Sequence, residues 1–325
     1  MGVNLRDLIT GHEIEWAELN GRKIAIDAMN TLYQFLATIR QPDGTPLMDQ
    51  NGKISSHLSG LFYRTIRVFE NGIKPIYVFD GKPPDLKGRE LEARKERKLQ
   101  AEEKWRDAKE RGDLEEAKKY ASMTSRFTPE MLQDSKRLLE AMGIPLIQAP
   151  SEGEAQCAHM CLKGDVYATG SQDYDSLLAG SSILIKNMTM QEKFKLERIE
   201  LAENLKNLGI TREQLVDIAL LMGTDFNAGV KGIGPKKGYK IVKEGQMAQY
   251  KEALGERYEM VRELFLKPKV TDKYELKWSK PDAPAVMKIL VDGHGFSDMR
   301  IDRGIKRLEE AYEKSVSQSS LRQWF

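Results

Sequence analysis

The sequence predicts an α/β fold in which a mostly parallel sheet is covered by helices. Short, continuous apolar runs recur in the first part of the chain, which is typical of strands that are buried on both faces. Helix-forming patterns separate these runs, as the crossover connections between parallel strands require. The expected strands cover residues 23–27, 75–80, 144–147, 166–169 and 183–185.

Composition excludes some classes of protein and leaves the partner open. The chain has 325 residues, of which 40% are hydrophobic and 8% aromatic, so it is not wholly disordered. No apolar run approaches the roughly 20 residues that span a bilayer, and the N-terminus carries no secretory pattern. Two cysteines, Cys157 and Cys161, cannot form a disulfide framework and indicate a reducing compartment. The net charge of +2, from 51 basic and 49 acidic residues, neither requires nor excludes a polyanionic partner.

Helix boundaries are clearest in the second half of the chain. Thr128 and Pro129 are typical of a helix start, and Gly143 of its end. A capping box at Thr211 begins another helix, which Gly223 ends. Further helices are expected from 245 to 307, interrupted by an irregular Pro-rich patch at 281–284.

The segment 85–120 has a different composition, dominated by Glu, Lys, Arg and Ala. Its part before Gly112 would form a helix roughly 40 Å long, which is long for a helix with few apolar residues to bury. One reading is a solvated surface helix with i,i+4 ion pairs. The other is a projection that stands off the domain and bends at 112–113.

Acidic residues follow the predicted strands. Asp27 and Asp80 end the first two strands, a Ser-Glu-Gly-Glu motif follows the third, and Ser-Gln-Asp-Tyr-Asp follows the fourth. A single Asp at such a place is often a helix cap. The carboxyl ends of parallel strands line one crevice, however, so the acids would converge there. The candidate residues are Asp27, Asp80, Glu152, Glu154, Asp173 and Asp175, with Asp225, at a helix end, as a seventh.

Close carboxylates repel one another unless cations neutralise them. Oxygen ligands suit Mg²⁺ or Mn²⁺, and so many of them suit a two-metal site for phosphoryl transfer. The four histidines lie far apart in sequence, so zinc is poorly supported. We also find no Ser-His-Asp arrangement and no Walker-type phosphate loop.

Basic residues gather in two segments. Residues 231–243 hold five lysines, three glycines and no acid, and a Gly-rich turn that opens a helix presents N–H groups to anions. We favour a phosphate contact over an ordinary turn because donors and charges coincide. Residues 87–98 hold six basic residues and three acids. Tyr33 could stack on a base or belong to the core.

These motifs resemble the flap endonuclease family in order and spacing, over nearly the whole chain. The resemblance rests on the segments 24–28, 77–84, 152–156, 173–175 and 232–236. It implies a PIN-like sheet, a helical arch and a helix–two-turn–helix that binds DNA, with the compact length of an archaeal replicative member. The expected organisation is one nuclease domain over 1–315 (N-terminal motif region about 1–98, arch about 82–128, internal motif region about 129–260, C-terminal helices 261–315) and a tail at 316–325.

The resemblance also implies roles for individual residues. The seven acids match the metal ligands, while Lys87 and Arg94 match basic residues at the base of the arch that contact the scissile phosphate. Residues 41–56 would wedge the junction and hold a one-nucleotide 3′ flap. The predicted DNA contacts are Gly2, Tyr33, Arg40, Arg64, Gly232, Gly234, Lys236, Lys237 and Lys240. The C-terminus resembles a sliding-clamp peptide with Gln318, Leu321, Trp324 and Phe325 as its anchors.

The function implied is a structure-specific 5′ flap endonuclease and 5′–3′ exonuclease, active in Okazaki fragment maturation and base excision repair. Two Mg²⁺ (or Mn²⁺) and a K⁺ at the helix–two-turn–helix are the expected cofactors. We expect a monomer without membrane contact, working in the archaeal cytoplasm at the nucleoid, or in the nucleus if the source is eukaryotic. Two alternatives stay open: an RNA-directed PIN-like nuclease, and a non-catalytic junction binder that recruits the clamp.

Overall fold

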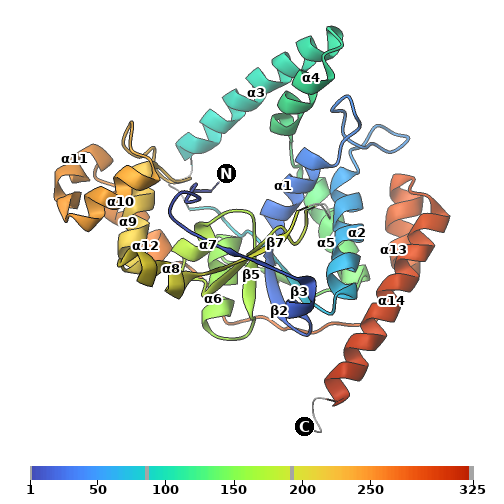
Figure 1. Ribbon diagram of the computed structural model, residues 1–325. Helices are drawn as coiled ribbons and strands as arrows, with labels where there is room; N and C mark the ends of the chain where they lie inside the picture. Colours follow the sequence, from blue (N-terminus) through green and yellow to red (C-terminus); the bar gives the residue numbers. More distant parts are fainter. Residues whose placement is uncertain (1, 85–87, 191–193, 322–325) are drawn as a thin grey trace.

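A mixed seven-stranded sheet forms the centre of the part of the chain that the structure describes (Figure 1). The computed structural model describes the backbone of residues 2–84, 88–190 and 194–321, and their side chains except at 88–95 and 318–321. The strand order is β1-β7-β6-β5-β2-β3-β4. The strands are β1 (His12–Ile14), β2 (Lys23–Asp27), β3 (Lys74–Phe79), β4 (Leu146–Gln148), β5 (Ala168–Gly170), β6 (Ile183–Lys186) and β7 (Leu196–Glu200).

The five predicted strands correspond to β2 to β6, and they run parallel to one another. The α/β prediction is therefore confirmed. Two strands at one edge were not predicted: β7 pairs antiparallel with β6, and β1 with β7. Both escape a search for continuous apolar runs, because β1 has three residues and β7 has only two apolar residues, separated by two charged ones.

Helices pack on both faces of the sheet (Figure 1). The first core cluster lies between the sheet and five helices, with Phe62 and Tyr77 fully buried. These helices are α1 (Ala28–Thr38), α2 (Ser56–Glu70), α5 (Pro129–Ala141), α13 (Ala283–Met287) and α14 (Asp298–Leu321). The second core cluster gathers α7 (Asp175–Leu178), α8 (Leu201–Leu208), α9 (Arg212–Met222), α10 (Pro235–Lys243) and α12 (Tyr258–Leu266). No described helix has the length and apolarity needed to cross a membrane.

The remaining described helices, apart from α3 and α4, are η1 (Trp16–Leu19), η3 (Ser122–Thr124), α6 (Gly153–Leu162), η4 (Gln246–Tyr250), α11 (Lys251–Leu254) and η5 (Lys288–Asp292).

The segment rich in charged residues forms a projection (Figure 1). Helix α3 (Gly88–Glu110) rises from the domain, the chain turns at Gly112 with φ +72°, and α4 (Leu114–Ala121) returns, capped by Asp113. The positive φ at the turn suits glycine. The buried alanines Ala108 and Ala117 let the two helices pack closely, so the hairpin needs few large apolar residues.

The C-terminal part differs from the expectation in two places. The irregular stretch covers 267–282 rather than 281–284, and α13 begins at Ala283. This stretch has an internal anchor, because Trp278 packs under the sheet and donates to the Pro75 carbonyl at 2.9 Å. The last helix, α14 (Asp298–Leu321), continues through 316–321, so the first part of the expected tail belongs to this helix.

Candidate active site

The strand order places a topological switch point between β2 and β5. The chain proceeds from β2 to β3 and β4 on one side, and from β5 to β6 on the other. Connections from neighbouring parallel strands leave in opposite directions at such a point, which opens a crevice at their carboxyl ends. Asp27 ends β2, Asp80 follows β3, and Asp173 follows β5.

Local structure fixes the first two acids. Asp27 is the N-cap of α1, and its Oδ1 accepts the Asn30 backbone N–H at 3.0 Å. The helix-cap reading and the site reading are therefore both correct for this residue. Asp80 Oδ1 accepts the Gly153 N–H at 2.7 Å, which ties the end of β3 to the start of α6.

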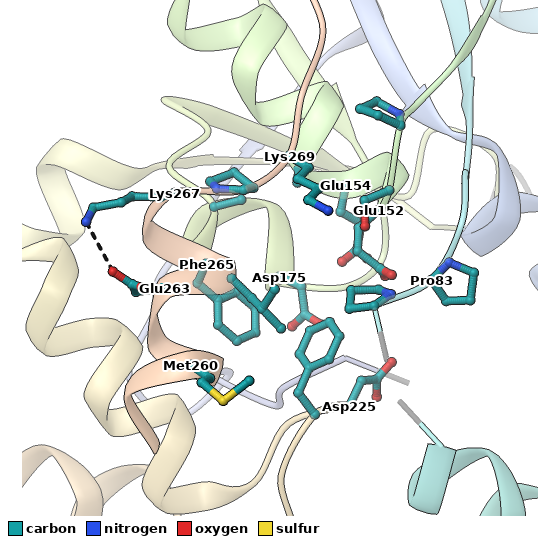
Figure 2. A pocket seen from close by; sticks show the side chains of 18 of the residues that line it. Pro83, Glu152, Glu154, Asp175, Asp225, Met260, Glu263, Phe265, Lys267 and Lys269 are labelled. Atoms are coloured by element: carbon teal, nitrogen blue, oxygen red, sulfur yellow. Dashed lines mark hydrogen bonds and ion pairs between the residues drawn. The ribbon is translucent and has the colours of Figure 1, made fainter. Parts of the chain in front are cut away.

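The other acids come from helix starts and one turn. Glu152 and Glu154 stand at the N-cap and first turn of α6. Asp175 begins α7, and its Oδ1 accepts the Val3 N–H at 2.9 Å. A Cβ on Gly2 would come within 2.8 Å of that same oxygen, so the predicted Gly2 does lie against the acids. Figure 2 shows Asp225 directed to the same cavity as Glu152, Glu154 and Asp175.

The acids lie close enough together to raise one another's pKa values. Burial raises the pKa of Asp27 to about 8, with further contributions from Asp80 and Asp173. Burial also raises the pKa of Asp175 to about 7, assisted by repulsion from Asp173 and Asp225. The pKa of Glu154 is well above its ordinary value because of burial and four neighbouring carboxylates. Glu152 joins the group through the cavity that it shares with Glu154 and Asp175.

These shifts predict that the metal-free protein loses stability as the pH rises. The pKa of Asp27 is about 8 in the folded chain against an ordinary 3.8, so the folded state holds a proton that the unfolded state releases between about pH 4 and 8. The melting temperature in EDTA should therefore fall by several degrees from pH 5 to pH 8. Adding Mg²⁺ should raise the melting temperature more at pH 8 than at pH 5. Thermal unfolding at both pH values measures these changes. If the melting temperature of Asp27→Asn falls with pH as much as that of the parent protein, Asp27 is not the group that holds the proton.

A hard divalent cation fits this donor set. The carboxylates repel one another, and the seven provide only oxygen ligands, which is the chemistry that Mg²⁺ prefers. As the described side chains are placed, no three His, Cys, Asp or Glu residues enclose an ion position. The fit therefore rests on donor type and charge, and the side chains must rotate to complete a coordination shell.

Asn30 positions two of the acids and was not predicted from the sequence. Its Nδ2 donates to Asp173 Oδ2 at 2.8 Å, and its Oδ1 accepts the Gln172 N–H at 3.1 Å. Its own backbone N–H donates to Asp27. Asn30 thus joins the end of β2 to the loop after β5. Its place three residues after Asp27 in a helix start is the one signal that the sequence offers.

We predict that Asn30→Leu weakens Mg²⁺ affinity or activity by about 10- to 100-fold, because outer residues that orient metal ligands have effects of that size. A Mg²⁺ titration followed by both calorimetry and cleavage rate measures the change. Asn71→Leu is the matched control, since the Asn71 amide donates to the Arg67 carbonyl at the C-terminus of α2, before β3 starts. If both variants behave as the parent protein does, Asn30 has no positioning role.

The comparisons with known proteins cover the whole chain. The model of the XPG N-terminal domain matches residues 1–101, and that of the XPG I-region matches 143–225. Flap endonuclease 1 of Thermococcus onnurineus is 54% identical over 100% of this chain and 99% of its own length. Flap endonuclease 1 of Pyrococcus furiosus is 52% identical over 100% and 99%. The chain belongs to the flap endonuclease family.

Solved structures of this family agree with the fold. Flap endonuclease-1 from Methanococcus jannaschii superposes with a TM-score of 0.82 at 45% identity, covering 96% of this chain and 99% of that one. The catalytic core of Rad2 in complex with DNA substrate gives a TM-score of 0.70 at 26% identity, covering 92% and 96%. The resemblance drawn from the motifs and the PIN-like fold is thereby confirmed.

The predicted duplex-binding turn has the backbone that such a contact needs. Gly232 has φ +79°, and a Cβ on Gly232 or Gly234 would meet no atom within 4 Å, so both face open space. Gly234 caps α10, with Pro235 as its first residue. Lys236, Lys237 and Lys240 are exposed on this helix. Lys243, at the end of the same basic run, instead donates to the Leu208 and Gly209 carbonyls at the end of α8.

Arg40 has a different environment from the one expected of a surface DNA contact. Its guanidinium donates to the Leu36 carbonyl at 2.8 Å, the Gly44 carbonyl at 2.9 Å and Ser125 Oγ at 3.0 Å. Burial lowers its pKa. Arg40 therefore joins α1, the following loop and the chain that descends from the arch. Whether it also touches DNA stays a prediction.

The remaining predicted residues divide into two sets. Tyr33 is 39% exposed beside the arch, with the Lys98 ammonium 5.3 Å from its ring centroid and the Phe127 ring at 5.7 Å. It is thus a surface aromatic rather than a core residue. Arg64 lies half-buried on α2. Several predicted residues lie outside the described part of the chain: Lys87, Trp324 and Phe325, and the side chains of Arg94, Gln318 and Leu321.

Proposed function

We propose that this chain is a divalent-metal-dependent, structure-specific nuclease that hydrolyses DNA where a single-stranded 5′ flap meets duplex. The gathering of seven carboxylates at the switch point of the sheet carries the proposal. Clustered carboxylates repel one another and repel phosphate, so a protein that only binds phosphate gains nothing from them. A metal-dependent nuclease needs them as ligands of its ions. Flap cleavage would place the chain in Okazaki fragment maturation and base excision repair, at the archaeal nucleoid.

Each group of residues then has a task. Asp27, Asp80, Glu152, Glu154, Asp173, Asp175 and Asp225 would hold Mg²⁺, two ions by our proposal, with Mn²⁺ able to replace them. Bound there, the metal supplies an activated water and stabilises the leaving oxygen. Lys87 and Arg94 neutralise charge on the scissile phosphate. The turn before α10 and its lysines hold duplex phosphates, with K⁺ as an optional ligand of the turn, and such contacts select shape rather than sequence.

The direct test is cleavage of a matched set of flap, nick, hairpin and single-stranded DNA substrates, with and without Mg²⁺. We expect Mg²⁺-dependent cutting of the flap near the junction and slower cutting of the others. Equal or faster cutting of an RNA flap would favour the RNA-directed alternative. Tight junction binding without any cutting in Mg²⁺ or Mn²⁺ would favour the non-catalytic adaptor.

We further propose that the C-terminus recruits a sliding clamp to a monomeric enzyme. The segment 318–325 combines a glutamine, an aliphatic and two terminal aromatic residues. Two adjacent aromatic residues beside a polar stretch favour a binding partner over a plain amphipathic segment.

Deleting 318–325 is expected to abolish clamp binding and to leave clamp-free flap cleavage unchanged, because the predicted catalytic groups all lie before residue 226. Calorimetric titration with the archaeal clamp and a cleavage assay without it measure the two effects. The variant Trp324→Ala with Phe325→Ala, which keeps the length, is the control for truncation. Clamp binding that survives in both variants would contradict the assignment.

A further inference from the structure

A cavity of about 570 Å³ continues from the acid cluster on the side of α12 (Figure 2). One wall is formed by four of the acids already described. The other wall comes from Phe226, from α12, from the chain that leaves α12, and from the chain after β3. None of the residues of this second wall had a predicted role in binding or catalysis.

The second wall is largely apolar inside its charged rim. Met260, on α12, is 56% exposed, and Phe226 packs edge-on against Phe265 with ring centroids 5.6 Å apart. Pro83 and Pro84 line the cavity below the arch. A metal site made of carboxylates does not need apolar side chains beside it. Apolar side chains that face this cavity therefore indicate that it binds a ligand with an apolar part.

The rim of the cavity carries positive charge. Lys267 forms an ion pair with Glu263 at 3.2 Å, and Figure 2 shows this pair at the edge of the pocket. Lys269, two residues further, is exposed and lines the cavity on the side of Glu152 and Glu154. No ion pair of Lys269 occurs among the described residues. An apolar wall with a lysine at its rim matches a group that is flat and apolar at one end and anionic at the other.

We infer that this cavity binds the flap nucleotide on the 5′ side of the scissile phosphate, with its base against Met260 and the phenylalanines and its next phosphate at Lys269. The inference rests on the proposed function and adds a subsite to it. The volume suits one small-molecule-sized group. A paired duplex, whose major groove alone is about 12 Å wide, is too large for a cavity of this volume. The occupant is therefore unpaired, and in a flap substrate the unpaired nucleotides lie on the 5′ side of the cut.

The test combines changes in the DNA and in the protein. The substrates are a flap with an abasic site at the nucleotide next to the scissile phosphate, and a control with the abasic site three nucleotides further out. Equilibrium binding is measured by fluorescence anisotropy in Ca²⁺, a hard ion that supplies charge at the carboxylates, with gels to check that the DNA stays intact. For the parent protein, the inner abasic site should weaken binding at least about fivefold, the lower end of the loss when a base loses its stacking surface. The outer site should have little effect.

In Met260→Ser combined with Lys269→Gln, the penalty of the inner abasic site should shrink to less than about twofold. Both residues are exposed, so folding is preserved. The control combines Met299→Ser, a methionine 63% exposed on α14, with Lys277→Gln, and should keep the full penalty. Equal penalties at the two abasic positions in the parent protein, or an undiminished penalty in the cavity variant, would overturn the inference. A parent protein that cuts no flap in Mg²⁺ would instead contradict the proposed function.

Discussion

Asp173→Asn is expected to slow flap cleavage in Mg²⁺ by at least about a hundredfold. The replacement keeps the shape of the side chain, and the amide oxygen can still accept the hydrogen bond from Asn30 Nδ2. It removes one negative charge from a group in which Asp173 raises the pKa of Asp27, Glu154 and Asp175. Loss of a single group that stabilises transition-state charge costs about 100- to 1000-fold in other enzymes, and loss of a metal ligand should cost no less.

Single-turnover cleavage of a flap substrate measures this effect. Substrate binding should be unchanged or slightly tighter, because the variant repels phosphate less. The control is Asp302→Asn, which removes an exposed carboxylate on α14 that pairs with Lys306. If Asp173→Asn cuts as fast as the parent protein, the assignment of these acids as the catalytic metal site is wrong.

The acid cluster could be predicted because it depends on one general property of parallel sheets. The central strands are continuous apolar runs, such as Ile24 to Ile26, and their carboxyl ends meet at one edge. The position of each acid relative to its strand is therefore enough to bring Asp27, Asp80 and Asp173 together. No side-chain detail is needed for that step.

Features that depend on the packing between distant segments could not be predicted. The amide of Asn30 meets Asp173, 143 positions away along the chain. The guanidinium of Arg40 is directed to backbone carbonyls and to Ser125, 85 positions away. The cavity needs α12 beside the chain after β3. Local sequence pattern carries no information about such contacts.

The arch is an intermediate case. Its composition predicted a long polar helix, and Gly112 marked the turn. The reason that the hairpin is stable became clear only with the buried alanines between α3 and α4. In a sequence, alanines indicate a helix, but they do not indicate that two helices will pack against each other.

The near-neutral total charge also has a structural explanation. Acids gather at the switch point, whereas exposed lysines gather on α10. The two surfaces carry opposite charges, so the net charge of the chain does not reveal either of them. A phosphate backbone can be held by α10 while the acid crevice attracts phosphate only after it has bound metal. This separation leads to a prediction about salt.

Replacing Lys236, Lys237 and Lys240 together by Gln is expected to reduce the salt dependence of DNA binding. If each lysine contacts one duplex phosphate, the slope of log K against log[salt] should decrease in magnitude by roughly 2.7, at about 0.9 per contact. Affinity at low salt should fall more than affinity at high salt. Flap cleavage at saturating enzyme should change little, because these side chains lie on α10 and not at the acid cluster.

Titrations of a flap duplex at several salt concentrations measure the slope. The matched control replaces Lys277, Lys280 and Lys306, which are also exposed but lie away from α10. Lys243 is kept in both variants, because its ammonium donates to the carbonyls at the end of α8. Replacing it would destabilise the fold and would not report on DNA binding. An unchanged slope in the α10 variant would remove this helix from the DNA-binding surface. Equal decreases in both variants would mean that general positive charge, and not the turn before α10, holds the duplex.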